Sequence, residues 1–222
     1  MNLYNEEVAI LGLGVSGLQT AFFLKKRGAR PFVSESSDNA EIRERMALLQ
    51  QADIPCEIGG HSVEHILAAS LIVISPGINP QTDIYTVLKR AQREIVSDVE
   101  LASWFFSGDI IAITGTDGKT TVTTMIAELL RYFGFDAITC GNIGNPFIGE
   151  LDQITEKTKV VLEVSSFQLY HTKRFKPKVA VLLNIAPDHL NWYYSYDDYT
   201  AAKRKIIENQ SSSDYVILNF RD

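Results

Sequence analysis

The chain has 222 residues, of which 45% are hydrophobic and 22% are charged, and its formal net charge is −6 at pH 7. This composition is typical of a globular protein with one large domain or two small ones. The acidic balance argues against the basic surface of a nucleic-acid-binding protein, and no apolar run approaches the ~20 residues that span a membrane. Cys56 and Cys140 lack metal-site spacing, and the N-terminus lacks a signal-peptide pattern. We therefore expect a cytoplasmic protein with free thiols.

Strand-length apolar runs alternate with longer helical patterns along the chain. The expected strands are 8–11, 31–35, 71–75, 110–114, 136–140, 160–164, 179–184 and 215–219. The expected helices are 16–28, 39–52, 81–92, 97–106, 119–133 and 197–209. This alternation predicts βαβ units in an α/β fold with largely parallel sheets. Because the apolar runs are continuous rather than alternating, we expect strands that are covered on both faces.

The first expected strand runs into the stretch "ILGLGVSGL" (10–18), in which Gly12, Gly14 and Gly17 have the spacing G-x-G-x-x-G. An acidic residue, Glu35, follows roughly 20 positions later. This pattern is typical of a Rossmann-like dinucleotide-binding turn, in which a helix N-terminus binds a diphosphate. On these residues alone, an NAD(P)-dependent oxidoreductase is an alternative.

A second loop, "ITGTDGKTT" (113–121), carries a stronger phosphate-binding pattern. Small residues let backbone N–H groups approach phosphate oxygens, Lys119 can reach the terminal phosphates, and the Thr120 hydroxyl can bind Mg²⁺. Ile113 stands where the usual pattern has its first glycine. The candidate ATP-binding residues are Gly115, Thr116, Asp117, Gly118, Lys119, Thr120 and Thr121.

Polar residues follow several of the later strands. Glu163 lies at the carboxyl end of an apolar run, where a Mg²⁺ ligand is expected, although a buried glutamate paired with a structural base is an alternative. His189 follows Asp188 just past another strand, which favours a functional histidine. The loop "GNIGNP" (141–146) fits either a ligand contact or a plain turn. Lys203 lies in a basic run on a helix, and nothing local distinguishes it.

The pattern divides the chain near residues 92–97. We expect a Rossmann-like domain over 1–95 and the first part of a P-loop-type domain over 96–222. The segment "SDVELASWFF" begins a new helix, with Ser97 as the N-cap and Glu100 at the capping-box position. The last strand comes directly before the terminus, so we expect the second sheet to be incomplete.

Five stretches in this order and spacing, "GTDGKTT", "GNIGNP", "LEVSSFQL", "LNIAPDHLN" and "YTAAKRKI", resemble the Mur ligase family of ATP-dependent amino-acid ligases. The stretches "GLGVSG" and "ISPGI" (74–78) look most like the member that adds D-glutamate to UDP-N-acetylmuramoyl-L-alanine. The resemblance runs along essentially the whole chain. It implies peptidoglycan precursor synthesis through an acyl phosphate, with ATP and Mg²⁺, and we expect a monomer.

The resemblance also implies roles for single residues. Lys119 would hold the ATP phosphates, and Thr120 and Glu163 would bind one Mg²⁺. His189 would bind a second Mg²⁺, and Lys203 would be carbamylated and so become a metal ligand. Lys119, His189 and Lys203 are the expected catalytic residues. The first loop would bind the UDP part of the substrate. The implied substrate-binding residues are Val15, Ser16, Glu35, Ser36, Ser75, Pro76, Gly77, Asn142, Ser165 and Gln168.

Three features depart from the family pattern. Asp117 stands where the family more often has asparagine, which adds a negative charge beside the phosphates, and "HLNWYY" (189–194) replaces a stretch that usually carries Asp and Arg. The family also has a longer central domain and a C-terminal domain that receives the amino acid. We therefore expect this chain alone to be a fragment with little ligase activity. A non-catalytic module that binds a UDP-sugar or another nucleotide is the alternative.

Overall fold

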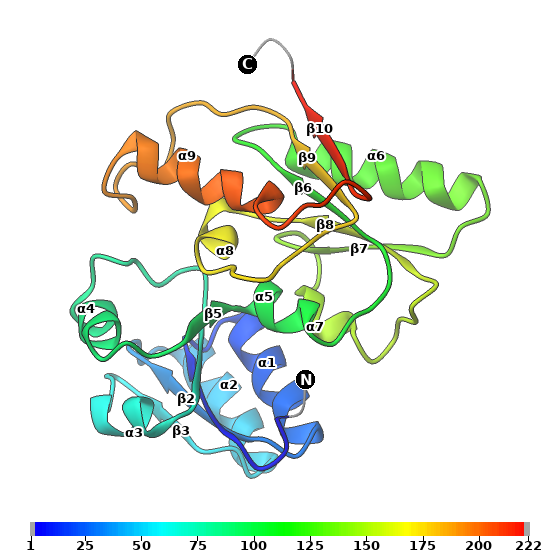
Figure 1. The fold of residues 1–222 in the computed structure, drawn as a ribbon. Helices are drawn as coiled ribbons and strands as arrows, with labels where there is room; N and C mark the ends of the chain where they lie inside the picture. The colour runs from blue at the N-terminus through cyan, green and yellow to red at the C-terminus, as the bar shows by residue number, and fades with distance from the viewer. Residues whose placement is uncertain (1–2, 220–222) are drawn as a thin grey trace.

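A computed structural model of the protein describes residues 3–219. Figure 1 shows two α/β halves, the first at the bottom of the view and the second at the top. In the described residues each half contains a five-stranded sheet, and every strand pair in both sheets is parallel. The predicted α/β fold with parallel sheets is confirmed.

The first sheet has the strand order β3-β2-β1-β4-β5. Its strands are β1 (Glu7–Leu11), β2 (Arg30–Glu35), β3 (Cys56–Ile58), β4 (Leu71–Ile74) and β5 (Ile95–Ser97). Its helices are α1 (Val15–Lys26), α2 (Ala40–Gln51), α3 (Val63–Ala68) and α4 (Asp83–Arg90). Successive side chains of β1 point to opposite faces, so Val8 and Ile10 pack with α1 and α2 while Ala9 and Leu11 pack with α3 and α4. The sheet is therefore covered on both faces, as the continuous apolar runs predict.

The second sheet has the strand order β10-β9-β6-β8-β7. Its strands are β6 (Ile110–Thr114), β7 (Ala137–Gly141), β8 (Lys159–Glu163), β9 (Val179–Leu182) and β10 (Tyr215–Leu218). The helices of this half are α5 (Asp98–Ser103), α6 (Lys119–Tyr132), α7 (Phe147–Glu150), α8 (Ser166–Tyr170), α9 (Tyr196–Arg204) and the short 3₁₀ helix η1 (Lys205–Ile207). Of the helices within residues 3–219, none is long and apolar enough to cross a membrane.

Several short elements differ from the sequence prediction. The strands β3 and β5 and the helices α3, α7 and α8 were not predicted, because three to six residues are too few to display a period. The first sheet includes β5, which pairs with β4 and ends at Ser97. The second sheet begins at Ile110, and the division of the chain into domains at 95/96 stays a prediction.

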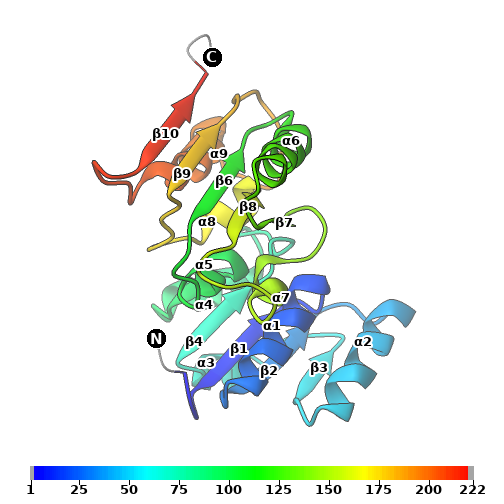
Figure 2. The same ribbon diagram turned by 90° about the vertical axis from the view of Figure 1, so that its right-hand side faces the viewer.

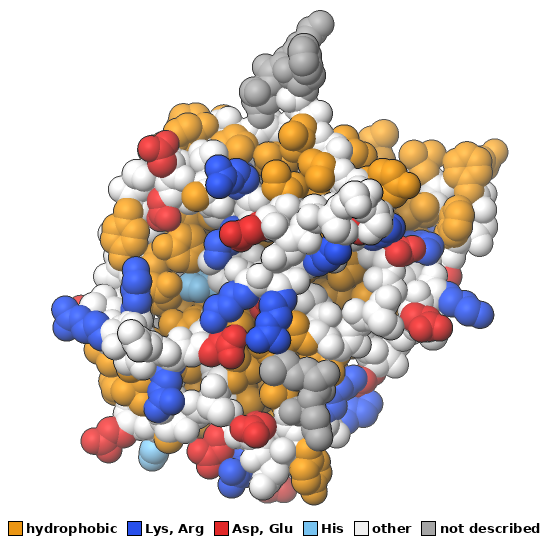
Figure 3. Space-filling view, viewed as in Figure 1, with side chains coloured by type: hydrophobic (Ala, Val, Ile, Leu, Met, Phe, Trp, Pro, Cys, Tyr) orange, Lys and Arg blue, Asp and Glu red, His pale blue; other side chains and the backbone are white. Residues whose placement is uncertain are grey.

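The strand β10 is exposed, although its apolar sequence favours a buried strand. Its four residues, Tyr215 to Leu218, are 42–64% exposed, because β10 is an edge strand that pairs only with β9 in the described residues. The outer side of α6 is also apolar and exposed, at Met125, Leu129 and Tyr132. Figure 3 shows hydrophobic side chains gathered over these upper parts of the molecule.

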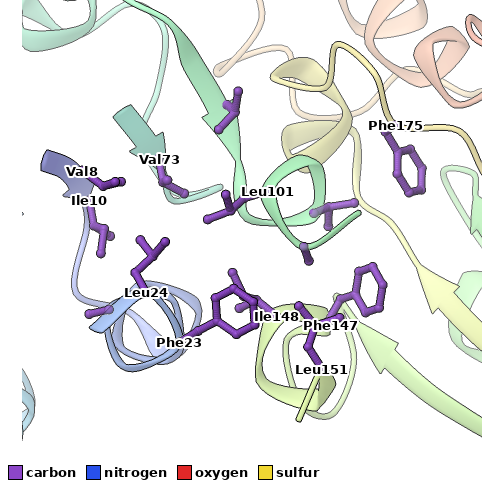
Figure 4. Packing of buried hydrophobic residues seen from close by; sticks show 14 of the residues in the cluster. Val8, Ile10, Phe23, Leu24, Val73, Leu101, Phe147, Ile148, Leu151 and Phe175 are labelled. Atoms are coloured by element: carbon purple, nitrogen blue, oxygen red, sulfur yellow. The ribbon is translucent and has the colours of Figure 1, made fainter. Parts of the chain in front are cut away.

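One hydrophobic core extends from the first sheet into the second half. Figure 4 shows Phe23 and Leu24 of α1 facing Phe147 and Ile148 of α7, with Leu101 of α5 between the two halves. All five residues are buried in the same cluster. Figure 2 shows α5 and α7 lying between the sheets, with the strands of the first sheet pointing toward the second half. The carboxyl ends of the first sheet therefore face the second half.

The helix α5 begins at the predicted N-cap, Ser97, but the Glu100 side chain forms other contacts than those of a capping box. The Ser97 hydroxyl caps the helix by accepting a hydrogen bond from the Glu100 N–H at 3.2 Å. The Glu100 carboxylate does not complete the capping box. It is fully buried and accepts hydrogen bonds at 2.8–2.9 Å from the Trp104 indole and from the backbone N–H groups of residues 173–175. Glu100 thus ties α5 to the loop before β9.

Candidate functional site

The second loop joins β6 to α6 in a shape suited to phosphate. Gly118 has a φ of +79°, a left-handed conformation that favours glycine, and it precedes the first turn of α6. The first-turn N–H groups of a helix lack partners inside the helix and carry its positive end. The Lys119 Nζ folds back over the loop and donates to the carbonyl oxygens of Gly115 and Thr116 at 2.9 and 2.7 Å. The structure therefore brings the loop, the helix terminus and the lysine together, and their binding of ATP stays a prediction.

Asn184, which was not among the predicted site residues, lies just after β9 and holds this loop by hydrogen bonds. Its Oδ1 accepts hydrogen bonds from the N–H groups of Thr116 and Asp117 at 3.0 and 2.9 Å. Its amide also donates to the Asp117 carbonyl at 3.2 Å. The Thr116 hydroxyl lies 2.8 Å from the hydroxyl of Tyr199 on α9. The position of Asn184 at a strand end was visible in the sequence, but its contact with the loop depends on β9 lying beside β6.

Glu163 ends β8 and meets two of the predicted residues. It is 1% exposed, and its carboxylate accepts hydrogen bonds from the Thr120 hydroxyl and the Asn142 amide, both at 2.7 Å. No Lys, Arg or His forms an ion pair with Glu163 within residues 3–219. The alternative of a structural base is therefore not supported. In the same described range, no group of three or more His, Cys, Asp and Glu side chains is placed to hold a metal.

Lys203 projects from α9 into the base of the phosphate loop. Its side chain is 2% exposed, and its Nζ donates to the Gly115 carbonyl at 2.7 Å and lies 4.8 Å from the centre of the Tyr199 ring. Burial, with a smaller contribution from nearby Lys119, lowers the pKa of Lys203 to about 8. A lysine on a basic helical run is usually solvated, so only the fold reveals this position.

His189 lies at the edge of the site rather than inside it. The residue is exposed, has a φ of +53°, and its Nε2 lies 3.4 Å from the Asp188 carboxylate. Its ring packs against Phe167 at a centroid distance of 4.8 Å. In the described part of the chain no hydrogen bond joins His189 to Thr120, Glu163 or Lys203. The stretch "HLNWYY" supplies an aromatic cluster, in which Trp192 and Tyr193 are buried with Tyr199.

Two of the three glycines in the first loop are required by their surroundings, and the third is not. Gly12 has a φ of +96°, and a Cβ there would lie 2.7 Å from Ser75. A Cβ on Gly17 would lie 1.9 Å from the Gly12 carbonyl oxygen, so only glycine fits. Gly14 is the N-cap of α1, and a Cβ there would meet no atom within 4 Å. The turn thus places the start of α1 against the end of β4.

Glu35 ends β2 and stabilises the first loop from within. Its carboxylate accepts hydrogen bonds from the N–H groups of Leu13 and Ser37 at 2.8 and 2.7 Å, and from the Ser36 hydroxyl at 3.3 Å. Burial raises the pKa of Glu35, but these hydrogen bonds outweigh it and bring the pKa below its ordinary value. The charged carboxylate therefore holds the loop.

The start of α1 meets the second half of the chain at Asp98. Val15 is 52% exposed, whereas the Ser16 hydroxyl donates to the buried Asp98 carboxylate at 2.6 Å. Burial raises the pKa of Asp98, and its Oδ1 has no hydrogen-bond partner within the described residues. In α8, the Ser165 and Gln168 side chains form a complete capping box. Ser16, Ser165 and Gln168 therefore have structural partners as well as their predicted substrate roles.

The loop after β4 lies beside the first loop and contains three of the predicted substrate-binding residues. Its Ser75 hydroxyl donates to the Gly12 carbonyl at 3.3 Å, and Pro76 and Gly77 follow it. A cavity of about 580 Å³ lies beside this loop. Its lining residues are Ser36, His61, Gly77, Ile78, Asn79, Gln81, Thr82, Asp83 and Ile84. The cavity thus joins two predicted substrate residues, Ser36 and Gly77, that come from opposite walls.

Comparison with known proteins matches both halves. The model of the MurD-like N-terminal domain of Mur ligases matches residues 6–97, and the model of the Mur ligase middle domain matches residues 113–222. The chain is 42% identical over 222 residues to the UDP-N-acetylmuramoylalanine–D-glutamate ligase of Geotalea uraniireducens. It is 40% identical over 225 residues to the ligase of the same name from Koribacter versatilis. The matches cover 100% and 99% of this chain but 49% and 48% of those relatives, so the chain spans about half their length.

Solved structures share the fold at lower identity. The UDP-N-acetylmuramate:L-alanyl-gamma-D-glutamyl-meso-diaminopimelate ligase of Neisseria meningitidis matches 98% of this chain and 72% of its own, with a TM-score of 0.60 and 17% identity. The UDP-N-acetylmuramate-alanine ligase of Thermotoga maritima matches 98% of this chain and 50% of its own, with a TM-score of 0.55 and 23% identity. Both halves of the sequence and both sheets point the same way: the chain belongs to the Mur ligase family and contains its MurD-like N-terminal domain and its middle domain.

Proposed function

We propose that this chain provides the UDP-substrate site and the ATP site of a ligase that adds D-glutamate to UDP-N-acetylmuramoyl-L-alanine. In this proposal the UDP part binds the domain at 1–95, and ATP binds the domain at 96–222. The observation that carries the proposal is the buried Glu163 carboxylate, which meets the Thr120 hydroxyl at the start of the phosphate-loop helix. A buried carboxylate without a cationic partner is costly, and a bound cation would offset that cost.

The donor set fits Mg²⁺ at this position. A carboxylate and a threonine hydroxyl are hard oxygen ligands, and Mg²⁺ commonly binds one or two carboxylates together with substrate phosphates. Thr120 and Glu163 would hold the ion, and the Asn142 amide would orient the carboxylate. When bound, Mg²⁺ supplies positive charge that neutralises the phosphate oxygens.

The phosphate loop would position ATP for attack by the substrate carboxylate. A carboxylate oxygen of the muramoyl-alanine substrate bonds to the γ-phosphorus, and the bond to the ADP oxygen breaks. Lys119 would exchange its bonds to the Gly115 and Thr116 carbonyls for bonds to phosphate oxygens. The amine of D-glutamate, having lost a proton, then attacks the acyl carbon, and inorganic phosphate leaves. Positioning and charge neutralisation account for the catalysis.

Lys203 suits the carbamate that the family resemblance implies. A buried lysine with a pKa of about 8 has a neutral fraction near neutral pH, and only the neutral amine adds CO₂ to form a carbamate with loss of a proton. The carbamate would turn a repelling ammonium into an oxygen ligand beside the phosphate loop. His189 would have to turn inward from its place beside Phe167 to join it.

A second candidate is a module that binds both nucleotides without ligation. The observation that favours it is the place of His189, which is exposed and forms no hydrogen bond to Thr120, Glu163 or Lys203 in the described residues. The two candidates agree on binding and differ on turnover. In both, a nucleotide-linked cell-wall precursor implies a cytoplasmic location.

Calorimetry and phosphate release together test the proposal. We expect UDP-N-acetylmuramoyl-L-alanine and Mg²⁺-ATP to bind the 222-residue chain, and NADH not to bind. Lys119→Met and Glu163→Gln should each weaken ATP binding at least tenfold. The control Lys157→Met, at an exposed position outside the phosphate loop, should leave ATP binding unchanged. Tight NADH binding without binding of the UDP-linked substrate would overturn the proposal. Binding of both ligands without phosphate release on addition of D-glutamate would favour the non-catalytic module.

A further inference from the structure

A chain of three polar side chains leads from the first sheet to the cavity beside Gly77. The Ser34 hydroxyl, fully buried in β2, lies 2.6 Å from the Glu57 Oε1 and 2.7 Å from the His61 Nδ1. His61 lines the cavity of about 580 Å³, together with Ser36 and Gly77. Neither His61 nor Glu57 was singled out by the sequence patterns, because the turn between them contributes no recognisable motif.

The proton positions in this chain follow from the carboxylate. Burial raises the pKa of Glu57, but hydrogen bonds from Ser34 and from the hydroxyl and N–H of Ser62 outweigh it, so the pKa lies below its ordinary value. An ionised carboxylate only accepts hydrogen bonds, so the single Ser34 hydroxyl proton is donated to Glu57. Ser34 must then accept from His61, and neutral His61 carries its proton on Nδ1.

This tautomer leaves a lone pair on the His61 Nε2. Within residues 3–219, no hydrogen bond to this atom is found. The ring is half-buried and forms part of the cavity wall. A ligand in the cavity therefore meets a hydrogen-bond acceptor whose orientation is fixed by the Ser34 and Glu57 contacts.

We propose that His61 is a specificity-determining residue of this cavity, whose Nε2 accepts a hydrogen bond from the imide N–H of a uracil base. The inference rests on the proposed function, which places a UDP-linked substrate between Ser36 and Gly77. Ser34 and Glu57 act through His61 and are positioning residues. A site that offers a fixed acceptor discriminates against a base whose matching N–H is missing, because the buried acceptor then stays unpaired.

The first test compares UDP with UDP that is methylated at the imide nitrogen of uracil, by calorimetry. We expect His61→Leu to weaken UDP binding about tenfold, in line with the loss of one hydrogen bond, and to leave binding of the methylated ligand within about twofold. His61→Gln, which places an amide oxygen near the former Nε2, should restore part of the UDP affinity. His65→Leu is the matched control, because His65 packs on Phe32 and does not line this cavity.

Two results would separate failure of this inference from failure of the proposed function. Equal weakening of both ligands by His61→Leu would show a structural role for His61 and overturn the inference alone. Absence of UDP binding to the wild-type chain would overturn both. A ligand-free measurement of the His61 ring by ¹⁵N NMR tests the tautomer: we expect the Nδ1–H form in the wild type and a shift toward Nε2–H in Ser34→Ala. An Nε2–H form in the wild type would also overturn the inference.

Discussion

At the scale of single residues, the burial of Lys203 is the clearest departure from what the local sequence predicts. Three basic residues in succession on a helix are usually solvated, yet α9 turns Lys203 into the protein beneath the phosphate loop. The desolvation of the ammonium group that follows is the main cause of its lowered pKa. A charge is held there at a cost to stability, which is the condition under which a chemical role is worth testing.

Stability should therefore rise with pH because of Lys203. The folded chain loses the Lys203 proton near pH 8, whereas the unfolded chain keeps it until about pH 10.5, so the unfolded state binds more protons between these values. Between pH 7 and pH 9.5 we expect the wild type to gain on the order of 1–2 kcal/mol in its free energy of unfolding relative to Lys203→Met. Urea unfolding of both proteins at several pH values measures the gain. Parallel pH profiles would contradict it.

Asn184 offers a second test at this scale. Its side chain accepts from two N–H groups of the phosphate loop, one of which also bonds the Asn184 carbonyl, so Asn184→Ala should destabilise the chain by about 0.5–1.5 kcal/mol and weaken ATP binding. The matched control is Asn209→Ala, which removes two hydrogen bonds to the carbonyls of Lys173 and Phe175, away from the loop. We expect the control to cost similar stability in urea unfolding and to leave ATP affinity unchanged. Equal ATP affinity for Asn184→Ala and the wild type would show that the loop needs no brace.

At the scale of elements, the turn between β1 and α1 contains glycines that differ in how much space surrounds them. Gly17→Ala places a methyl group against the Gly12 carbonyl, so we expect a loss of about 3 kcal/mol or more in unfolding free energy. Gly14→Ala meets no atom within 4 Å and should cost about 1 kcal/mol or less, since it only weakens the N-cap of α1. Thermal unfolding of the two variants measures the difference. Similar losses for both would mean that the turn can open without strain.

The longer elements could be predicted from the sequence, and the shorter ones could not. The helix α6 shows its helical period over 14 residues, and the strands β6 and β8 stand out as apolar runs of strand length, which is enough to identify them. The three-residue strands β3 and β5 become strands only because a neighbour offers a free edge for pairing. The exposure of β10 could not be predicted from its sequence either, since burial depends on what packs over a strand rather than on its own residues.

At the scale of the whole molecule, the two sheets share one core. Phe147 of α7 is fully buried in the cluster that also contains Phe23 of α1, and Asp152 pairs with Lys26 and Arg27 across the same boundary. Because this contact is extensive and apolar, we expect one unfolding transition for both halves rather than two. The loop after β4 adds polar contacts, such as the Gln81 amide to the Trp192 carbonyl at 3.2 Å.

Truncation of the shared core should therefore affect the whole chain. Phe147→Ala should lower the free energy of unfolding by about 3–5 kcal/mol and move the single transition as a unit in calorimetry. Phe133→Ala, at a position that is 71% exposed, should change it by about 0.5 kcal/mol or less. If Phe147→Ala instead splits the transition, or melts only one half, the two halves are independent.

The sequence by itself determined the α/β class, both glycine loops, the Glu163 strand end and the family, because these depend on local order and spacing. Only the tertiary structure decided which side chains meet. The pairing of β6 with β8 and β9 brings Glu163 to Thr120 and Asn184 to Thr116, and α9 delivers Lys203 to Gly115. The Ser34, Glu57 and His61 chain is likewise formed by pairing of β2 with β3. Contacts between distant segments depend on how strands pair and helices pack, and no local pattern encodes them.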